Sequence, residues 1–221
     1  MQALQLAAHL AAGEALAGWK VDLTHGSRAV QRTAGPLDRG FILASQVQSE
    51  GVGLAATDFI APKIEPEAAV LLERDLPGPG ITVENVMGAV GAVYPAMEVI
   101  DSRIADWDLE RVDAVADNAL CAAIVVGDVP FPVTLEDLSL LSCTLVIDGH
   151  PAERGRAEDL PFGDLLTPVV WLANQLVERG APLQAGQLVL PGSLTKAMPV
   201  LADSTAMADF GVLGSLTVAV S

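Results

Sequence analysis

The sequence has few basic residues, and this shortage limits what the protein can bind. Lys and Arg together number 12 against 28 Asp and Glu, so the formal net charge is −16 at pH 7. A surface of that sign repels phosphate backbones and anionic membrane faces, which argues against nucleic acid and membranes as partners. It also repels an anionic small molecule, unless a metal ion or a local Lys or Arg reverses the charge inside a pocket.

Cysteines are also few, and long apolar runs are missing. Cys121 and Cys143 form neither a CxxC motif nor a disulfide framework, so we interpret both as buried apolar residues in a reducing compartment. The Ala/Leu-rich segment 1–19 lacks the basic start of a signal peptide, and His9 and Glu14 interrupt it. No segment approaches the length needed to span a bilayer. The sequence therefore predicts a soluble, cytoplasmic protein.

Two common enzyme signatures are absent from the sequence as well. Its glycines at 88, 91 and 192 form neither a GxGxxG nor a P-loop pattern, and there is no GxSxG element. Nucleotide binding and Ser-His-Asp hydrolysis are therefore poorly supported. What the chain does have is apolar content, with 51% hydrophobic residues over 221 positions. That length suits one domain, 1–221, with a substantial core.

Hydrophobic periodicity predicts a mixed α+β domain built on a curled sheet. The segment 1–16 is expected to be a helix with Ala3, Leu6, Ala7 and Leu10 toward the core. Further helices are expected at 83–93, ended by Tyr94-Pro95, and at 167–178. Many short strands are expected between them, at 18–24, 41–43, 52–54, 63–72, 97–101, 119–126, 187–190 and 214–220, with a hairpin over 140–156.

Two carboxylates lie two residues apart at the start of one of these strands. In an extended chain Glu65 and Glu67 share one face, with Cα atoms about 6.5 Å apart. Such a pair suits a hard divalent cation, and Glu98 in the strand 97–101 offers a third oxygen ligand. The alternative is that Glu65 and Glu67 are the solvated face of an edge strand, with Pro66 marking the edge.

Several blocks spread over nearly the whole chain resemble one enzyme family. They occur at 18–24 (GWKVDLT), 62–68 (PKIEPEA), 98–104 (EVIDSRI), 106–107, 115–118, 171–174, 192–195 and 208–215. In this order they are similar to the 2-keto-4-pentenoate hydratase / 4-oxalocrotonate decarboxylase family, within the fumarylacetoacetate-hydrolase-like superfamily. Each block alone is weak, but together they are highly specific.

The resemblance implies a fold, a cofactor and a substrate class. The implied fold is a rolled mixed β-sheet or incomplete barrel flanked by helices, like the C-terminal domain of fumarylacetoacetate hydrolase. Glu65, Glu67 and Glu98 would bind Mg²⁺ or Mn²⁺. The substrate would be a small 2-oxo or 2-hydroxydienoic acid from aromatic meta-cleavage catabolism. The implied partners are further copies of the chain in a homo-oligomer, or a related pathway enzyme.

The sequence departs from the family pattern near its front. Asp22 stands where the family usually has Gly, and fewer residues than usual precede the strand that carries Lys20. These differences leave the substrate open and suggest a further alternative, a non-catalytic subunit of the same fold that partners a related enzyme. Retention of all three glutamates argues against that alternative.

Candidate catalytic and substrate-binding residues follow from position. Lys20 and Asp38 resemble the family's active-site lysine and the acid that follows it, and an adjacent pair could hold different pKa values. Alternatively, Lys20 is only a structural partner of Asp22 and Asp38. Four residues are candidates for substrate binding: His25, Lys63, Ser193 and Thr195. Each could instead have a structural role, on the surface, as a counter-charge or in a turn.

The leading hypothesis is a metal-dependent lyase that adds water to 2-hydroxypenta-2,4-dienoate (2-keto-4-pentenoate) or a close relative. The alternative is decarboxylation of 4-oxalocrotonate (2-oxo-3-hexenedioate), because the same metal would hold the enolate that remains when CO₂ departs. Residues that contact a distal carboxylate would separate the two reactions, and the sequence alone does not identify them.

Overall fold

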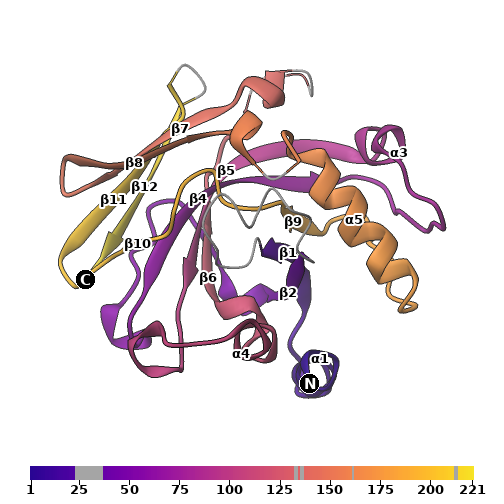
Figure 1. Ribbon diagram of the computed structural model, residues 1–221, viewed down its shortest axis with the longest axis horizontal. Helices are drawn as coiled ribbons and strands as arrows, with labels where there is room; N and C mark the ends of the chain where they lie inside the picture. Colours follow the sequence, from indigo (N-terminus) through magenta and orange to yellow (C-terminus); the bar gives the residue numbers. More distant parts are fainter. Residues whose placement is uncertain (23–36, 132–133, 135–136, 161, 212–213) are drawn as a thin grey trace.

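The structure is a computed structural model that describes residues 1–22, 37–131, 134, 137–160, 162–211 and 214–221. Within these residues the chain forms two β-sheets with helices around them (Figure 1). The larger sheet has the strand order β2-β1-β9-β4-β5-β6-β3, and β10 pairs with β4. Its strands are β1 (Leu16–Asp22), β2 (Asp38–Leu43), β3 (Val47–Ser49), β4 (Lys63–Leu72), β5 (Val90–Ile100), β6 (Cys121–Val126), β9 (Leu188–Leu190) and β10 (Met198–Pro199).

The second sheet has four strands in the order β12-β11-β7-β8, at the upper left of Figure 1. The predicted hairpin over 140–156 is confirmed as β7 and β8, which turn at Asp148-Gly149. The strands of this sheet are β7 (Ser142–Ile147), β8 (His150–Arg156), β11 (Ser204–Asp209) and β12 (Ser215–Val220).

Helices lie along the outside of the larger sheet. Helix α5 runs along the right of Figure 1, and α4 and α1 lie at its lower end. The inner face of α5 is fully buried, as the 3.6-residue spacing of its apolar residues predicts. The helices are α1 (Gln2–Ala11), α3 (Val83–Met87), α4 (Arg111–Ala116) and α5 (Leu166–Val177).

The larger sheet is mixed and open. β1 pairs parallel to β9 and β3 parallel to β6, whereas the other pairs are antiparallel. Among the described residues no ladder joins the two end strands β2 and β3, so the curled sheet does not close. The predicted α+β class and incomplete barrel are therefore confirmed.

The strand β4 begins and ends where the sequence predicts, but it is not an edge strand. β5 flanks it along its whole length, and β9 and β10 pair with its other side at different points. Pro66 lies between the β9 and β10 contacts, where its carbonyl accepts a hydrogen bond from Leu194 N. A residue without an N–H is tolerated at this gap because no ladder bond is required there.

The predicted helix over 83–93 is wrong beyond its first turns. Thr82 caps α3 as expected, but the helix stops at Met87 and Gly88 follows it. From Val90 the chain becomes β5, an eleven-residue strand along β4, so Tyr94-Pro95 lies inside a strand instead of ending a helix. The β-branched and aromatic side chains of this segment fit a long buried strand better than a helix.

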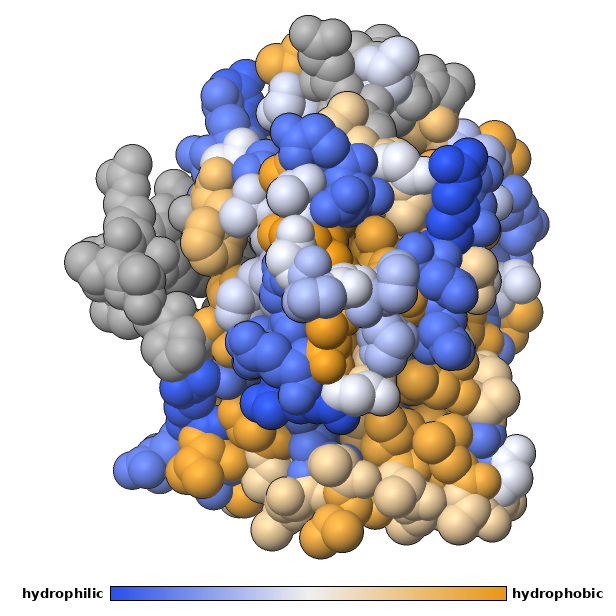
Figure 2. Space-filling view, turned by 90° about the vertical axis from the view of Figure 1, so that its right-hand side faces the viewer, coloured by the Kyte–Doolittle hydropathy of each residue, from blue (hydrophilic) through white to orange (hydrophobic). Residues whose placement is uncertain are grey.

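Helix α1 turns its polar side inward, which contradicts the predicted core positions. Gln2 and Gln5 donate side-chain hydrogen bonds to the carbonyls of Arg39 and Ala116. Of the four apolar residues expected in the core, Leu6 alone is partly buried. Apolar surface gathers at the lower end of the face in Figure 2, the end at which Figure 1 shows α1. A helix does form, but it ends at Ala11 and not at residue 16, and the face that contacts the protein is the one with the glutamines.

Within the described part of the chain, no helix is both long and apolar enough to cross a membrane.

Candidate metal centre

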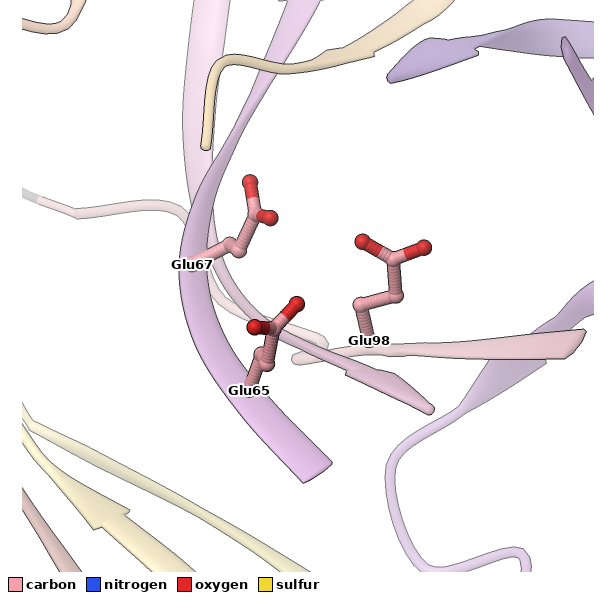
Figure 3. A group of neighbouring side chains, drawn as sticks. All are labelled: Glu65, Glu67 and Glu98. Carbon is pink, nitrogen blue, oxygen red and sulfur yellow. The ribbon is translucent and has the colours of Figure 1, made fainter. Parts of the chain in front are cut away.

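Three glutamates meet on neighbouring central strands. Glu65 and Glu67 alternate along β4, and the β4/β5 register places Glu98 directly opposite Glu65. The three side chains point toward one another (Figure 3). One carboxylate oxygen from each lies within 4.8 Å of the others. Residues directly opposite on antiparallel strands have Cβ atoms about 5 Å apart, so the sheet itself sets this convergence.

The cluster is removed from water, and like charges are crowded in it. Glu67 and Glu98 are 1% and 0% exposed, and Glu65 is half-buried. Desolvation and the charge of Glu98 raise the pKa of Glu65 to about 8. The same two causes, with Glu65 added, raise the pKa of Glu67 well above its ordinary value. Two buried acids and a half-buried one side by side are costly for stability, which makes the cluster a candidate for function.

Lys20 supplies the cation that the cluster contacts directly. Its ammonium lies 2.6 Å from Glu98 Oε1 and donates a hydrogen bond of 2.9 Å to the carbonyl of Ala119. Burial lowers the pKa of Lys20, but the charges of Glu98 and Asp22 outweigh this effect and raise the pKa above its ordinary value. Lys20 is only 2% exposed and is held protonated.

The wall around Lys20 is built from backbone that leaves room for its stem. A Cβ added at Gly40 would lie 2.9 Å from Lys20 Cγ and 2.6 Å from the carbonyl oxygen of Asn118. Residues Asn118, Ala119 and Leu120 all have positive φ angles, and this turn carries the carbonyl that receives the lysine. Strained backbone of this kind concentrates at functional sites.

Glu67 is oriented by the chain that follows β9. Its Oε2 accepts a 3.0 Å hydrogen bond from the backbone N–H of Gly192. Ser193, one residue further, uses its hydroxyl on the carbonyls of Pro66 and Thr195. The 192–195 block thus fixes one ligand candidate through its backbone.

The donor set fits a hard divalent cation. Both carboxylate oxygens of Glu98 are buried and accept no hydrogen bond of good geometry, although the Lys20 ion pair contacts one of them. A buried carboxylate without hydrogen-bond donors is expensive unless a charge balances it. Oxygen donors from three carboxylates are the set that Mg²⁺ and Mn²⁺ prefer.

Asp38 does not pair with Lys20. The β1/β2 register sets Lys20 opposite Gly40 and Asp38 opposite Asp22. Asp38 instead binds Arg111 of α4 through two hydrogen bonds, one of them 2.7 Å long from Nε. The expected Lys20–Asp38 pair is therefore replaced by Lys20–Glu98 and Asp38–Arg111. A catalytic role for Asp38 stays a prediction.

The candidate substrate-binding residues lie in different settings. Lys63 begins β4 and places its ammonium 3.6 Å from the ring centre of Trp107. The Ser193 and Thr195 hydroxyls donate to backbone carbonyls, which agrees with the turn-stabilising alternative. His25 lies outside the described residues. Substrate binding by these four residues stays a prediction.

Sequence reasoning missed Gly40, Arg111 and the carbonyl of Ala119. Arg111 begins α4, a short helix at positions for which no element is predicted from the sequence. No pattern in the sequence links any of them to Lys20 or Asp38. Their roles come from the β1/β2 register and from the turn that precedes β6.

The open mixed sheet has the fold of fumarylacetoacetate-hydrolase-like proteins. A solved fumarylacetoacetate hydrolase from Exiguobacterium antarcticum superposes with a TM-score of 0.69 at 16% identity, covering 94% of this chain and 76% of that one. Identity this low shows a shared fold alone. No family model matches the sequence.

Closer relatives give the family. The chain is 38% identical over 206 residues to a "2-keto-4-pentenoate hydratase" of Paraburkholderia phymatum, covering 92% of this chain and 78% of the relative. The 4-oxalocrotonate decarboxylase from Pseudomonas putida G7, complexed with magnesium and adipate, superposes with a TM-score of 0.90 at 30% identity. That match covers 100% of this chain and 83% of the decarboxylase. The chain belongs to the 2-keto-4-pentenoate hydratase / 4-oxalocrotonate decarboxylase family.

Proposed function

We propose that the protein is a metal-dependent hydro-lyase that adds water to 2-hydroxypenta-2,4-dienoate or a close 2-oxo acid in aromatic meta-cleavage catabolism. The observation that carries the proposal is the convergence of Glu65, Glu67 and Glu98 beside the buried Lys20. The name of the Paraburkholderia phymatum relative supports the reaction, and the magnesium complex of the decarboxylase supports the cofactor.

The three glutamates would hold Mg²⁺, or Mn²⁺ in its place. When bound, such an ion neutralises the carboxylate and 2-oxo oxygens of the substrate and stabilises negative charge that develops on it. Lys20 holds a proton at Nζ, next to Glu98, and this fixed ammonium would stabilise negative charge that develops on the substrate. The Ala119 carbonyl and the bare backbone at Gly40 keep that ammonium in one position.

The variant Glu65→Gln tests this function. We expect loss of metal-dependent turnover and, by calorimetry, Mg²⁺ binding weaker by at least about tenfold, because one anionic ligand of three is removed. Glu178→Gln, on the exposed end of α5, makes the same charge change away from the cluster and should behave as the unmodified protein. Unchanged turnover and unchanged Mg²⁺ affinity in Glu65→Gln would remove the basis of the proposal.

Decarboxylation of 4-oxalocrotonate is the second candidate. The superposition on the Pseudomonas putida decarboxylase favours it, because that protein matches over the whole of this chain. The two reactions are separated by measuring CO₂ release from 4-oxalocrotonate and loss of dienol absorbance from 2-hydroxypenta-2,4-dienoate with one preparation. A protein that binds Mg²⁺ but turns over neither substrate would point to the non-catalytic partner subunit.

We also propose a homo-oligomer in the cytoplasm. The outward apolar side of α1 supports self-association, since Leu4 and Leu10 are 77% and 45% exposed there. The free, buried Cys121 and Cys143 agree with a reducing compartment. Light scattering on Leu4→Asp against the unmodified protein tests the assembly, and an unchanged mass would remove α1 from the interface.

A further inference from the structure

Asp22 lies on the same side of β1 as Lys20. Side chains two residues apart on a strand share a face, so Asp22 follows Lys20 at the end of β1 on the face that meets the glutamates. The preceding position on that face is Gly18, which has no side chain and lies tight against the backbone of Leu188. Beside Lys20, the nearest side chain of β1 on this face is thus an acid.

The Asp22 carboxylate is partly buried and lacks a direct ionic partner among the described residues. Its Oδ2 is buried and has no hydrogen-bond partner, and no ion pair to Asp22 is present in this part of the chain. Its cross-strand neighbour is a second acid, Asp38, which Arg111 binds through two nitrogens. Arg111 therefore forms its ion pair with Asp38 and not with Asp22.

The electrostatic influence of Asp22 reaches the centre of the site. Its charge helps to raise the pKa of Lys20, Glu65 and Glu98, although Lys20 responds first to its own burial and to Glu98, and the two glutamates respond first to burial. It also acts on Arg111 on the other side. Asp22 therefore lies between the carboxylate cluster and the Asp38–Arg111 pair.

We propose that Asp22 is a specificity-determining residue that disfavours 2-oxo acids with a second carboxylate and so selects monocarboxylic substrates. The inference rests on the proposed function, because it assumes that the 2-oxo acid head binds at the glutamates and Lys20. The head carboxylate meets positive charge there. A distal carboxylate of a four- to six-carbon acid that extends along this face meets Asp22, and like charges in a desolvated site repel.

Family membership leaves this choice open, which is why a residue on this face matters. The Paraburkholderia phymatum relative is named for a monocarboxylic acid, whereas the Pseudomonas putida decarboxylase is complexed with adipate, a dicarboxylate. Lys63 is the other described lysine close to the glutamates, and its ammonium rests on the ring of Trp107. It would have to leave that ring to serve a distal carboxylate.

Binding of two saturated 2-oxo acids in the presence of Mg²⁺ tests the proposal without turnover. 2-Oxohexanoate and 2-oxohexanedioate have equal carbon chains and differ in a terminal methyl or carboxylate. Calorimetry should give a Kd for the dicarboxylate at least about tenfold weaker in the unmodified protein, the ratio expected from one unscreened like charge at short range. Asp22→Asn should bring the two Kd values within about threefold by tightening the dicarboxylate alone.

Two further variants complete the experiment. Asp108→Asn removes a charge from an exposed residue and should keep the tenfold preference of the unmodified protein. Asp22→Ser should repeat the result of Asp22→Asn, and it keeps the test decisive if the asparagine variant does not fold. Thermal unfolding identifies the folded variants.

The outcomes separate this inference from the proposed function. An equal preference in the unmodified protein and both folded Asp22 variants would overturn the role of Asp22 while leaving the metal-dependent site intact. Failure of the unmodified protein to bind either 2-oxo acid with Mg²⁺ would overturn the proposed function, and the inference with it. Tighter binding of the dicarboxylate in the Asp22 variants alone supports both the inference and the proposed function.

Discussion

Replacing Lys20 with Met should expose how much the carboxylate cluster depends on one cation. The substitution keeps most of the aliphatic stem but removes the ammonium that contacts Glu98 at 2.6 Å and the carbonyl of Ala119 at 2.9 Å. Both members of the ion pair are buried, with 2% and 0% of their side chains exposed. The variant therefore leaves the Glu98 charge buried without its partner.

The magnitude follows from that geometry. Two unit charges 2.6 Å apart attract by about 6 kcal/mol at an effective dielectric constant near 20. The cost of desolvating the ammonium offsets part of this, and measured losses on removing one partner of a buried pair are about 3–5 kcal/mol. We expect Lys20→Met to lower the free energy of unfolding by about that amount when no metal is present.

Urea unfolding in EDTA measures the loss, with Glu98→Gln and the double variant alongside. The double variant should recover most of the stability, because neither charge is then left alone in the core. Saturating Mg²⁺ should also reduce the loss in Lys20→Met, since the glutamates would gain another counter-charge. A loss below about 1 kcal/mol, or a double variant no more stable than Lys20→Met, would refute the assigned ion pair.

Two further predictions concern the same site. The pKa of Glu65 is about 8 in the folded protein, so the stability that its proton contributes is fully present below its unfolded pKa and is lost as the pH rises through about 8. Thermal unfolding in EDTA should therefore show a Tm that falls from pH 6 to pH 9. A rising Tm would contradict this prediction. Gly40→Ala places a Cβ against Asn118 O and Lys20 and should reduce turnover and stability together, whereas Gly53→Ala, with its nearest neighbour 3.7 Å away, should change neither.

The shared face of Glu65 and Glu67 could be predicted from local periodicity, whereas the choice of all three glutamates as metal ligands came from the family resemblance. The period of two puts Glu65 and Glu67 on one face, and β4 and β5 are joined closely enough in sequence to pair. The ion pairs around the cluster could not be predicted from local periodicity. Lys20 meets Glu98 and Ala119 only through the combined placement of β1, β5 and the turn before β6, which no spacing in the sequence encodes.

The sequence mispredicts an element where one local pattern is compatible with two structures. Thr82 predicts the start of a helix, and α3 does begin there. No feature of the sequence extends that helix beyond its end at Met87. Periodicity alone does not separate a helix from a strand in the apolar run that follows, although its β-branched residues favour the strand, which pairs along the whole of β4. In α1 a helix does form, while hydrogen bonds from Gln2 and Gln5 decide which side faces inward.

An acidic protein that binds an acidic substrate needs a local reversal of charge, and the cluster indicates how it arises. Burial and crowding raise the pKa values of Glu65 and Glu67, so a divalent cation would have to displace their protons in order to bind beside Lys20. The bound cation would then supply the positive charge that a 2-oxo acid needs. Anion binding should thus be strictly linked to metal binding, each strengthening the other by the same factor. In our proposal Asp22 sets the limit of that reversal, because it lies two residues beyond Lys20 on the same face of β1. The metal would neutralise the carboxylate at the head of the substrate, whereas Asp22 would repel a second carboxylate at the distal end. The site would therefore prefer molecules with a single acidic end.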